Sequence, residues 1–145
     1  MYGPSPPRPS PIRIRPHPAP SPTHKNGSIL TSPLQVQKLA DSPGDIVLID
    51  VREPGELAST GRIPGALNIP VTTAPDAFFL SEEEFEDKFG FERPAKDAEV
   101  VFYCKAGVRS RAAAGLAQSA GWERVGEFPG SWNVWSEKGG RVDRT

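Results

Sequence analysis

The chain carries its strongest structural signal in the run Val100-Val101-Phe102-Tyr103-Cys104-Lys105-Ala106-Gly107-Val108-Arg109-Ser110-Arg111. The β-branched and aromatic residues that open this run favour a strand, and the alanine-rich residues 112–117 behind it favour a helix. Cys104 therefore lies at the carboxyl end of a strand and faces the amino end of a helix. Unpaired N–H groups and the helix dipole stabilise anions at such a place, so we expect a lowered thiol pKa, with a contribution from Lys105 and Arg109. A cysteine that merely packs at a strand end is the alternative.

Strand-like and helix-like segments alternate along the rest of the chain. We expect strands at residues 46–49, 66–70, 99–103 and 124–128, and helices at 33–42, 53–58, 82–89, 110–120 and 133–138. N-caps at Ser32 and Ser81 and a C-cap at Gly121 support these bounds, and Glu53 and Glu56 fit a capping role in the first turn of the second helix. The alternation predicts an α/β fold with a mainly parallel central sheet and helices on both faces. Ligands of such sheets bind at the carboxyl ends of the strands.

Residues 1–31 differ in composition from the rest. They contain nine prolines among Ser, Arg and His residues, a spacing that prevents both a helix and a strand ladder. We expect a disordered or polyproline-like basic tail at 1–31 and one domain at 32–145. Three roles for the tail stay open: an inert segment, a targeting segment whose prolines oppose the usual amphipathic helix, or a ligand for a proline-binding domain through Pro6-Pro7-Arg8-Pro9.

The charge distribution separates this tail from the domain. No acidic residue precedes Asp41, whereas five of the 17 Lys and Arg residues do, so the remaining residues hold 12 basic against 18 acidic side chains and a formal charge of −6. An acidic domain binds nucleic acid poorly, and a positive loop on it suits a small anion. No run approaches the ~20 apolar residues of a membrane span. We therefore expect neither a nucleic-acid nor a membrane partner.

The cysteine and histidine content limits the chemistry of the site. Cys104 is the only cysteine, and the two histidines, His17 and His24, both lie in the tail. These counts argue against an intrachain disulfide, a zinc site or a Cys–His pair within the domain. We expect no metal and no organic cofactor, and a thiol that electrostatics alone activates. A free thiol of this kind suits a reducing compartment, cytoplasmic or mitochondrial.

Four motifs occur in order along the domain: Ile49-Asp50-Val51-Arg52-Glu53, Gly61-Arg62-Ile63-Pro64-Gly65-Ala66-Leu67-Asn68-Ile69-Pro70, Cys104 to Ser110, and Phe128-Pro129-Gly130-Ser131-Trp132. Over about residues 30–140 the chain resembles the rhodanese family of sulfurtransferases, and above all its small single-domain thiosulfate sulfurtransferases of the eukaryotic type. The resemblance implies a rhodanese-like domain in which Cys104 takes a sulfane sulfur from a donor such as thiosulfate, becomes a persulfide and passes the sulfur on. Arg62 is a departure, because the family more often has a histidine there that is not the nucleophile.

The loop behind the nucleophile supplies the groups that we expect to bind the donor: Lys105, Ala106, Gly107, Val108 and Arg109. Its backbone N–H groups can stabilise both the thiolate and the persulfide anion, and Gly107 allows a close approach and a positive φ. Lys105 and Arg109 are expected to attract a dianionic donor, with solvated surface charge as the alternative for both. The arginine fork suits oxyanions better than the lysine ammonium does. The resemblance implies that Arg109 closes the loop.

Four further residues are expected to support the site: Asp50, Arg52, Ser110 and Trp132. The resemblance places Asp50 and Arg52 on the strand beside the catalytic one, where a structural pair that fixes the loop is favoured over direct catalysis. Ser110 is interpreted as the N-cap of the helix behind the loop, with a hydroxyl contact to the loop as a second role. Trp132 either rims the pocket and contacts the acceptor or packs in the core.

Two other functions share parts of this pattern. Cys-dependent phosphatases and arsenate reductases also combine a cysteine, a loop and an arginine at a helix N-terminus. Their loop has one residue more than the four between Cys104 and Arg109, and the shorter loop suits sulfur better than a phosphoryl group. A catalytically silent rhodanese-like binding module would be expected to lack the cysteine. We therefore favour a sulfurtransferase with a two-step, ping-pong mechanism.

The expected partners are small molecules or a small thiol protein. The donor is thiosulfate or a related compound. Because the chain has no second cysteine to resolve a persulfide, the acceptor must come from outside. A low-molecular-weight thiol such as glutathione, or thioredoxin, fits this requirement, and the sequence leaves the oligomeric state open.

Overall fold

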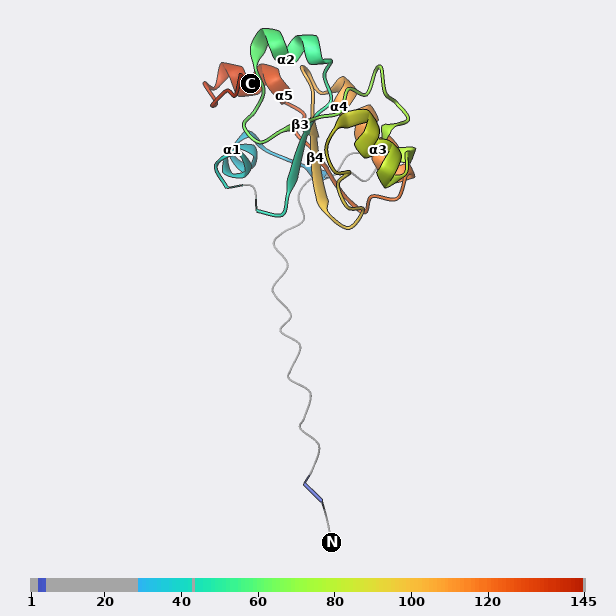
Figure 1. Ribbon diagram of the computed structural model, residues 1–145. Helices are drawn as coiled ribbons and strands as arrows, with labels where there is room; N and C mark the ends of the chain where they lie inside the picture. The colour runs from blue at the N-terminus through green and yellow to red at the C-terminus, as the bar shows by residue number, and fades with distance from the viewer. Residues whose placement is uncertain (1–2, 5–28, 43, 145) are drawn as a thin grey trace.

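A computed structural model describes residues 3–4, 29–42 and 44–144 of the chain. Its centre is a five-stranded sheet in the order β1-β5-β4-β2-β3, in which neighbouring strands run parallel (Figure 1). The strands are β1 Ile29–Leu30, β2 Val47–Asp50, β3 Leu67–Asn68, β4 Glu99–Tyr103 and β5 Arg124–Glu127. Parallel neighbours need crossover connections, which helices supply. The predicted α/β fold with a parallel sheet is confirmed.

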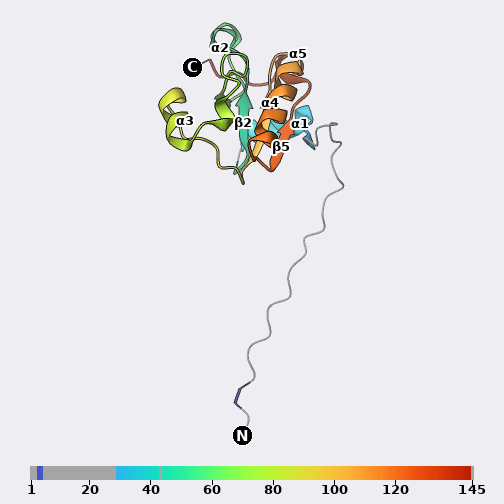
Figure 2. The same cartoon turned by 90° about the vertical axis from the view of Figure 1, so that its right-hand side faces the viewer.

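Helices cover both faces of the sheet, with α1 and α3 on opposite sides of the strands in Figures 1 and 2. The helices are α1 Pro33–Asp41, α2 Pro54–Thr60, α3 Glu82–Phe89, α4 Val108–Ser119 and α5 Ser131–Glu137, with a 3-10 turn, η1, at Ala77–Phe79. Buried side chains of α1 and α5 form one apolar cluster with Val101 and Tyr103, and those of α3, α4 and η1 form another with Val100 and Phe102. Because successive strand residues point to opposite faces, β4 fills both halves of the core.

Capping boxes set two helix starts where the sequence predicts them. Ser32 Oγ accepts a hydrogen bond from Gln35 N–H at 3.3 Å, and Ser81 Oγ accepts one from Glu84 N–H at 3.2 Å. In each box the Gln or Glu side chain accepts a hydrogen bond from the N–H of the capping serine in return. Two N–H groups that the helix leaves unpaired are thereby satisfied, and α3 spans the expected residues 82–89.

The sheet begins earlier than the sequence suggests. Ile29–Leu30 pairs in parallel with β5, and Thr31 N–H donates to Glu127 O at 2.6 Å, so the sheet starts three residues before the boundary expected at residue 32. A two-residue edge strand is too short to show a periodic pattern in the sequence. The rest of the expected tail, 1–2 and 5–28, lies outside the described residues.

Two helix starts also differ from expectation. α4 and α5 each begin two residues early, at Val108 and Ser131, and neither has a side-chain hydrogen bond at its N-cap. A start of this kind leaves no capping signal in the sequence. At the other end of α4 the C-cap is Ala120, and Gly121 follows it with a φ of +109°.

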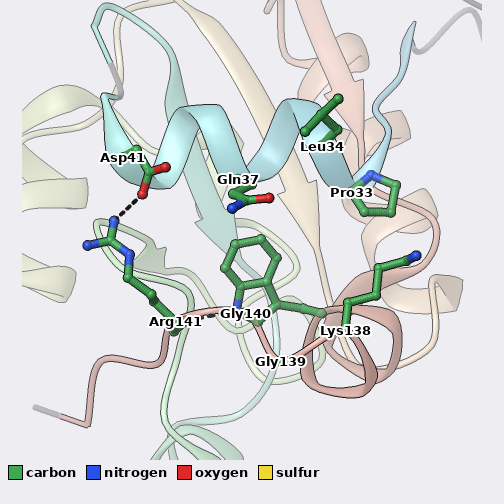
Figure 3. Close-up of a pocket in the computed structure, with 9 residues that line it drawn as sticks. Pro33, Leu34, Gln37, Asp41, Lys138, Gly139, Gly140 and Arg141 are labelled. Carbon is green, nitrogen blue, oxygen red and sulfur yellow. Dashed lines mark hydrogen bonds and ion pairs between the residues drawn. The ribbon is translucent and has the colours of Figure 1, made fainter.

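The C-terminal segment, residues 138–144, packs across α1. Arg141 Nη2 donates to Asp41 Oδ1 at 2.5 Å, and Trp135 Nε1 donates to Arg141 O at 2.8 Å. Between α1 and this segment lies a cavity of about 540 Å³, and Figure 3 shows the side chains of Asp41 and Arg141 facing each other at its edge. None of the residues predicted for the reactive site lines this cavity.

Arg62, where the resemblance leads us to expect a histidine, has a structural role. Its Nη1 donates to Ala66 O at 3.2 Å, and its backbone exchanges two hydrogen bonds of 2.8 Å with Asp143. The neighbouring Gly61 has a φ of +81°, and a Cβ at this position would collide with Val142. This tight crossing holds the C-terminal segment against the end of α2.

Two kinds of feature are absent from the ranges 29–42 and 44–144. No helix there is long and apolar enough to cross a membrane. In the same ranges no three His, Cys, Asp or Glu side chains lie close enough together to hold a metal ion.

Phe102 tests the central packing, because its ring is fully buried and meets Phe78 edge-on with 5.4 Å between the ring centroids. We expect Phe102→Ala to lower the free energy of unfolding by about 3–5 kcal/mol through lost burial and the cavity left behind. The matched control is Phe79→Ala, since Phe79 is 57% exposed, and it should change this free energy by less than ~0.5 kcal/mol. Urea unfolding measures both variants, and equal losses would contradict the packing described.

Candidate active site

Cys104 follows β4 directly, at the carboxyl end of the central strand. Val51 N–H donates to Tyr103 O at 3.0 Å, so β2 runs beside β4 up to this point. The cysteine is 1% exposed, and its Sγ accepts a hydrogen bond from Gly107 N–H at 3.0 Å. The loop therefore curls back over its own cysteine and points a backbone donor at the sulfur.

Gly107 makes this turn possible. Its φ is +97°, and a Cβ at this position would stand 2.5 Å from Pro129 O. Only glycine takes such a conformation without strain at such a close approach. Lys105, Ala106 and Val108 are exposed around it, so the loop presents backbone to the sulfur and side chains to the solvent.

Ser110 is not the N-cap of α4, and that expectation is wrong. Gly107 occupies the N-cap position, and Ser110 lies in the first turn of the helix. Its buried hydroxyl is 3.2 Å from Gly107 O and 3.4 Å from Cys104 Sγ. A left-handed glycine starts the helix straight from the loop and turns Ser110 inward, so the expected hydroxyl contact to the loop is present.

Ser131 completes the surroundings of the cysteine and is absent from the residues that the sequence singles out. Its Oγ accepts a hydrogen bond from Cys104 N–H at 3.1 Å, donates to Phe128 O at 2.8 Å and lies 3.8 Å from Cys104 Sγ. The next residue, Trp132, donates its N–H to Cys104 O at 2.9 Å. The amino end of α5 thus anchors the loop. The only signal for Ser131 in the sequence is its place within the motif at 128–132.

Hydrogen bonds lower the pKa of the Cys104 thiol. Burial acts in the opposite direction and raises this pKa, but bonds from the Ser110 hydroxyl and N–H, the Gly107 N–H and the Ser131 hydroxyl outweigh it. The largest effects that favour the thiolate are therefore these donors, rather than the charges of the two flanking cations. A thiolate stabilised in this way is a nucleophile at a lower pH than a free cysteine.

Asp50 and Arg52 form a buried ion pair. Arg52 Nη2 lies 2.7 Å from Asp50 Oδ2, and Arg52 Nε lies 3.0 Å from Oδ1. The guanidinium also donates to Thr60 Oγ1 at 2.9 Å and to Gly61 O at 3.0 Å, and it stacks 4.7 Å from the centroid of the Trp132 ring. Each guanidinium nitrogen has a partner inside the protein, which favours the structural role over a catalytic one.

Arg109 turns toward α2 and forms a two-pronged ion pair with Glu56. Its Nη1 and Nη2 lie 2.6 and 2.9 Å from the two carboxylate oxygens. The hydrogen bond from Arg109 lowers the pKa of Glu56 to about 2. Glu56 also accepts a hydrogen bond from Glu53 N–H at 2.8 Å, which is the cap that the sequence predicts. The sequence does not predict the ion pair, which closes the loop with a carboxylate from another helix.

Trp132 both packs in the core and borders a pocket, whereas its expected contact with the acceptor stays a prediction. It is 7% exposed and packs in a core cluster with Tyr103 and Phe128. It also borders a cavity of about 220 Å³ between α2 and the loop, together with Lys105. The same indole ring therefore packs in the core and borders the pocket.

Known proteins match both the sequence and the fold. The family model described as the rhodanese-like domain matches residues 32–138. The mitochondrial thiosulfate sulfurtransferase RDL2 of Saccharomyces cerevisiae is 45% identical over 107 residues, which cover 73% of this chain and 71% of the relative. The thiosulfate:glutathione sulfurtransferase of the same yeast is 42% identical over 96 residues, covering 66% and 68% of the two chains. The structure of the human single-domain sulfurtransferase TSTD1 matches with a TM-score of 0.68 at 33% identity, covering 83% of this chain and 98% of that one.

Ser110→Ala should raise the pKa of Cys104, because it removes the hydroxyl that contacts the sulfur. At neutral pH a smaller fraction of the thiol is then ionised, and alkylation by iodoacetamide slows. The matched control is Ser119→Ala at the exposed end of the same helix, which should leave the titration unchanged. Thiolate absorbance against pH measures the pKa, and a midpoint that stays or falls in Ser110→Ala would refute the contact.

Gly107→Ala should disturb the loop, because alanine must adopt a positive φ and its Cβ meets Pro129 O. We expect a loss of about 1–3 kcal/mol in the free energy of unfolding and slower alkylation of Cys104 at neutral pH. Gly115→Ala in the middle of α4 is the control, since a Cβ there meets nothing within 4 Å. It should stabilise the protein by up to ~1 kcal/mol. Similar behaviour of the two variants would show that the loop does not need glycine.

Proposed function

The chain belongs to the rhodanese-like domain family, and we propose that it is a thiosulfate sulfurtransferase that carries sulfane sulfur as a persulfide on Cys104. The observation behind this proposal is the buried Sγ at the end of β4, with Gly107 N–H at 3.0 Å and Ser110 Oγ at 3.4 Å. Donors in this position stabilise a sulfur anion, both as the thiolate and as a terminal persulfide. Relatives at 42% and 45% identity are named for the same activity.

In the first half-reaction the Cys104 thiolate attacks the outer sulfur of thiosulfate. The S–S bond of the donor breaks, its electron pair leaves with sulfite, and Cys104 becomes a persulfide anion, so atoms and charge balance without an oxidant. The lowered pKa of Cys104 favours the ionised nucleophile. Exposed Lys105 attracts the dianionic donor, and Arg109, bound to Glu56, keeps the loop closed.

The two serine hydroxyls have separate tasks, because each carries a single proton. Ser131 Oγ lies 2.8 Å from Phe128 O and 3.8 Å from the sulfur, so it chiefly fixes the backbone around the cysteine, and its share in lowering the pKa of Cys104 is the smallest of the four donors. Ser110 lies at similar distances from Gly107 O and Cys104 Sγ, 3.2 and 3.4 Å. In the thiol form the S–H donates to Ser110 Oγ. After ionisation the Ser110 hydroxyl turns and donates to the sulfur, which stabilises the thiolate without an imidazole.

In the second half-reaction an external thiol removes the outer sulfur. Cys104 is the only cysteine, so no internal thiol can resolve the persulfide. Two relatives are named thiosulfate:glutathione sulfurtransferase, which supports glutathione as the acceptor for this chain, with thioredoxin as the protein alternative. Two relatives are named as mitochondrial, which together with the free thiol supports a reducing compartment, mitochondrial or cytoplasmic.

The loop geometry weighs against phosphatase activity. Four residues separate Cys104 from Arg109, and the Arg109 fork is occupied by Glu56. The guanidinium that would bind a phosphoryl group is therefore already neutralised inside the protein. A catalytically silent binding module, the other alternative, does not require hydrogen-bond donors around a buried thiol, so their presence favours the enzyme.

Thiosulfate should add one sulfur atom, ~32 Da, to the purified protein in intact mass spectrometry, and excess glutathione should remove it. Cys104→Ser should gain no mass while keeping the unfolding midpoint of the wild type. If neither thiosulfate, mercaptopyruvate nor glutathione persulfide loads the wild-type protein, the sulfurtransferase proposal falls and the binding module is favoured. Hydrolysis of p-nitrophenyl phosphate that depends on Cys104 would favour the phosphatase instead.

A further inference from the structure

The cavity of about 220 Å³ beside the reactive loop has no role in the steps described so far. Its walls are Gly55, Glu56, Ser59 and Thr60 of α2, Lys105 of the loop and Trp132 of α5, with Arg52 contributing to the lining. Lys105 follows the cysteine directly, and Trp132 N–H donates to Cys104 O at 2.9 Å. The cavity therefore lies beside the backbone of Cys104.

The charges around this cavity are compensated, with one exception. Arg52 is paired with Asp50, and Glu56 is paired with Arg109. Lys105 is exposed, and its ammonium group forms no ion pair with any side chain that the structure describes. A ligand in the cavity thus meets one unopposed positive charge next to an indole ring, a combination that suits an organic anion.

The size of the cavity narrows the choice of anion. A water molecule takes about 30 Å³ of liquid volume, so about 220 Å³ corresponds to roughly seven such volumes. This space is larger than a single sulfonate group fills, and because it is open to solvent the rest of a longer ligand can extend out of it. One amino-acid end of a peptide thiol can enter it, and the carboxylate of that end is the group that Lys105 would bind.

We propose that this cavity binds a carboxylate-bearing end of the low-molecular-weight thiol acceptor, with Lys105 as the anion-binding residue and Ser59 and Trp132 as walls. The inference rests on the proposed function, because it locates the acceptor of the second half-reaction. Bound there, the acceptor approaches Cys104 from the side of α2. Lys105 then serves the donor in the first half-reaction and the acceptor in the second.

The transfer needs no further reagent. The acceptor thiolate attacks the outer sulfur of the Cys104 persulfide, and a new S–S bond forms as the bond between Sγ and the outer sulfur breaks. Cys104 leaves as the thiolate that Gly107 N–H and Ser110 stabilise. The acceptor departs as a persulfide anion, and its carboxylate interaction with Lys105 affects binding rather than the intrinsic reactivity of the thiol.

Ser59→Trp tests the cavity, because it fills the space from an exposed position outside the loop. The protein is loaded with thiosulfate, freed of the donor and mixed with a thiol, so that only the second half-reaction is followed. We expect the rate constant with glutathione to fall about tenfold, through loss of one charge-assisted contact. With 2-mercaptoethanol, which is too small to need the cavity, it should change less than about twofold. Ser119→Trp at the exposed end of α4 is the matched control and should behave as the wild type.

Lys105→Gln separates the charge from the shape. The loaded variant should react with glutathione about tenfold more slowly than the loaded wild type does. With glutathione diethyl ester, which lacks the free carboxylates, the variant and the wild type should react at the same rate. The inference would be overturned if Lys105→Gln slowed the reactions with glutathione and with its diethyl ester equally. It would also be overturned if Ser59→Trp left the rate constant with glutathione unchanged. Slower loading of Ser59→Trp by thiosulfate with an unchanged glutathione step would assign the cavity to the donor and also overturn it. A wild-type protein that never loads would instead refute the proposed function, and the inference with it.

Discussion

The buried guanidinium of Arg52 is the constraint on which the site depends. It ties β2, α2 and α5 together through Asp50, Thr60 Oγ1, Gly61 O and the ring of Trp132. Removing one partner of a buried charge pair costs about 3–5 kcal/mol, because the other charge is left without compensation. The two helices are therefore fixed against the strand beside the catalytic one. They in turn supply the partners that hold the reactive loop from two sides.

This rigid frame allows the protein to bury a thiol and still favour its ionised form. Burial alone raises the pKa of Cys104, and hydrogen bonds from the loop, from Ser110 and from Ser131 reverse the effect. The reversal depends on Gly107, whose positive φ brings its N–H to 3.0 Å from Sγ and starts α4 without any intervening residue. A sulfur shielded from water and supplied with donors suits a persulfide, which is an anion that water would otherwise reach.

The two basic side chains of the loop, Lys105 and Arg109, have different surroundings. The planar guanidinium of Arg109 matches the geometry of the Glu56 carboxylate and forms two hydrogen bonds with it. Lys105 stays exposed and has no ion-pair partner in the described part of the chain. We therefore propose that Lys105, rather than Arg109, attracts the anionic donor. In a ping-pong mechanism sulfite leaves before the acceptor binds, so the same ammonium group can serve both half-reactions in turn.

Short-range patterns were enough to predict the strand, loop and helix around Cys104, the bounds of α3 and the parallel α/β architecture, because propensity, capping and periodicity act between neighbours. They did not reveal the contact of Ser131 with a cysteine 27 residues away or the pairing of Glu56 with Arg109 over 53 residues. They also misassigned Ser110, whose direction depends on how a left-handed glycine starts α4. Contacts of this kind form only when distant segments pack against one another. The sequence alone therefore predicted a reactive thiol at Cys104, whereas the tertiary structure decided which distant residues surround it and change its pKa.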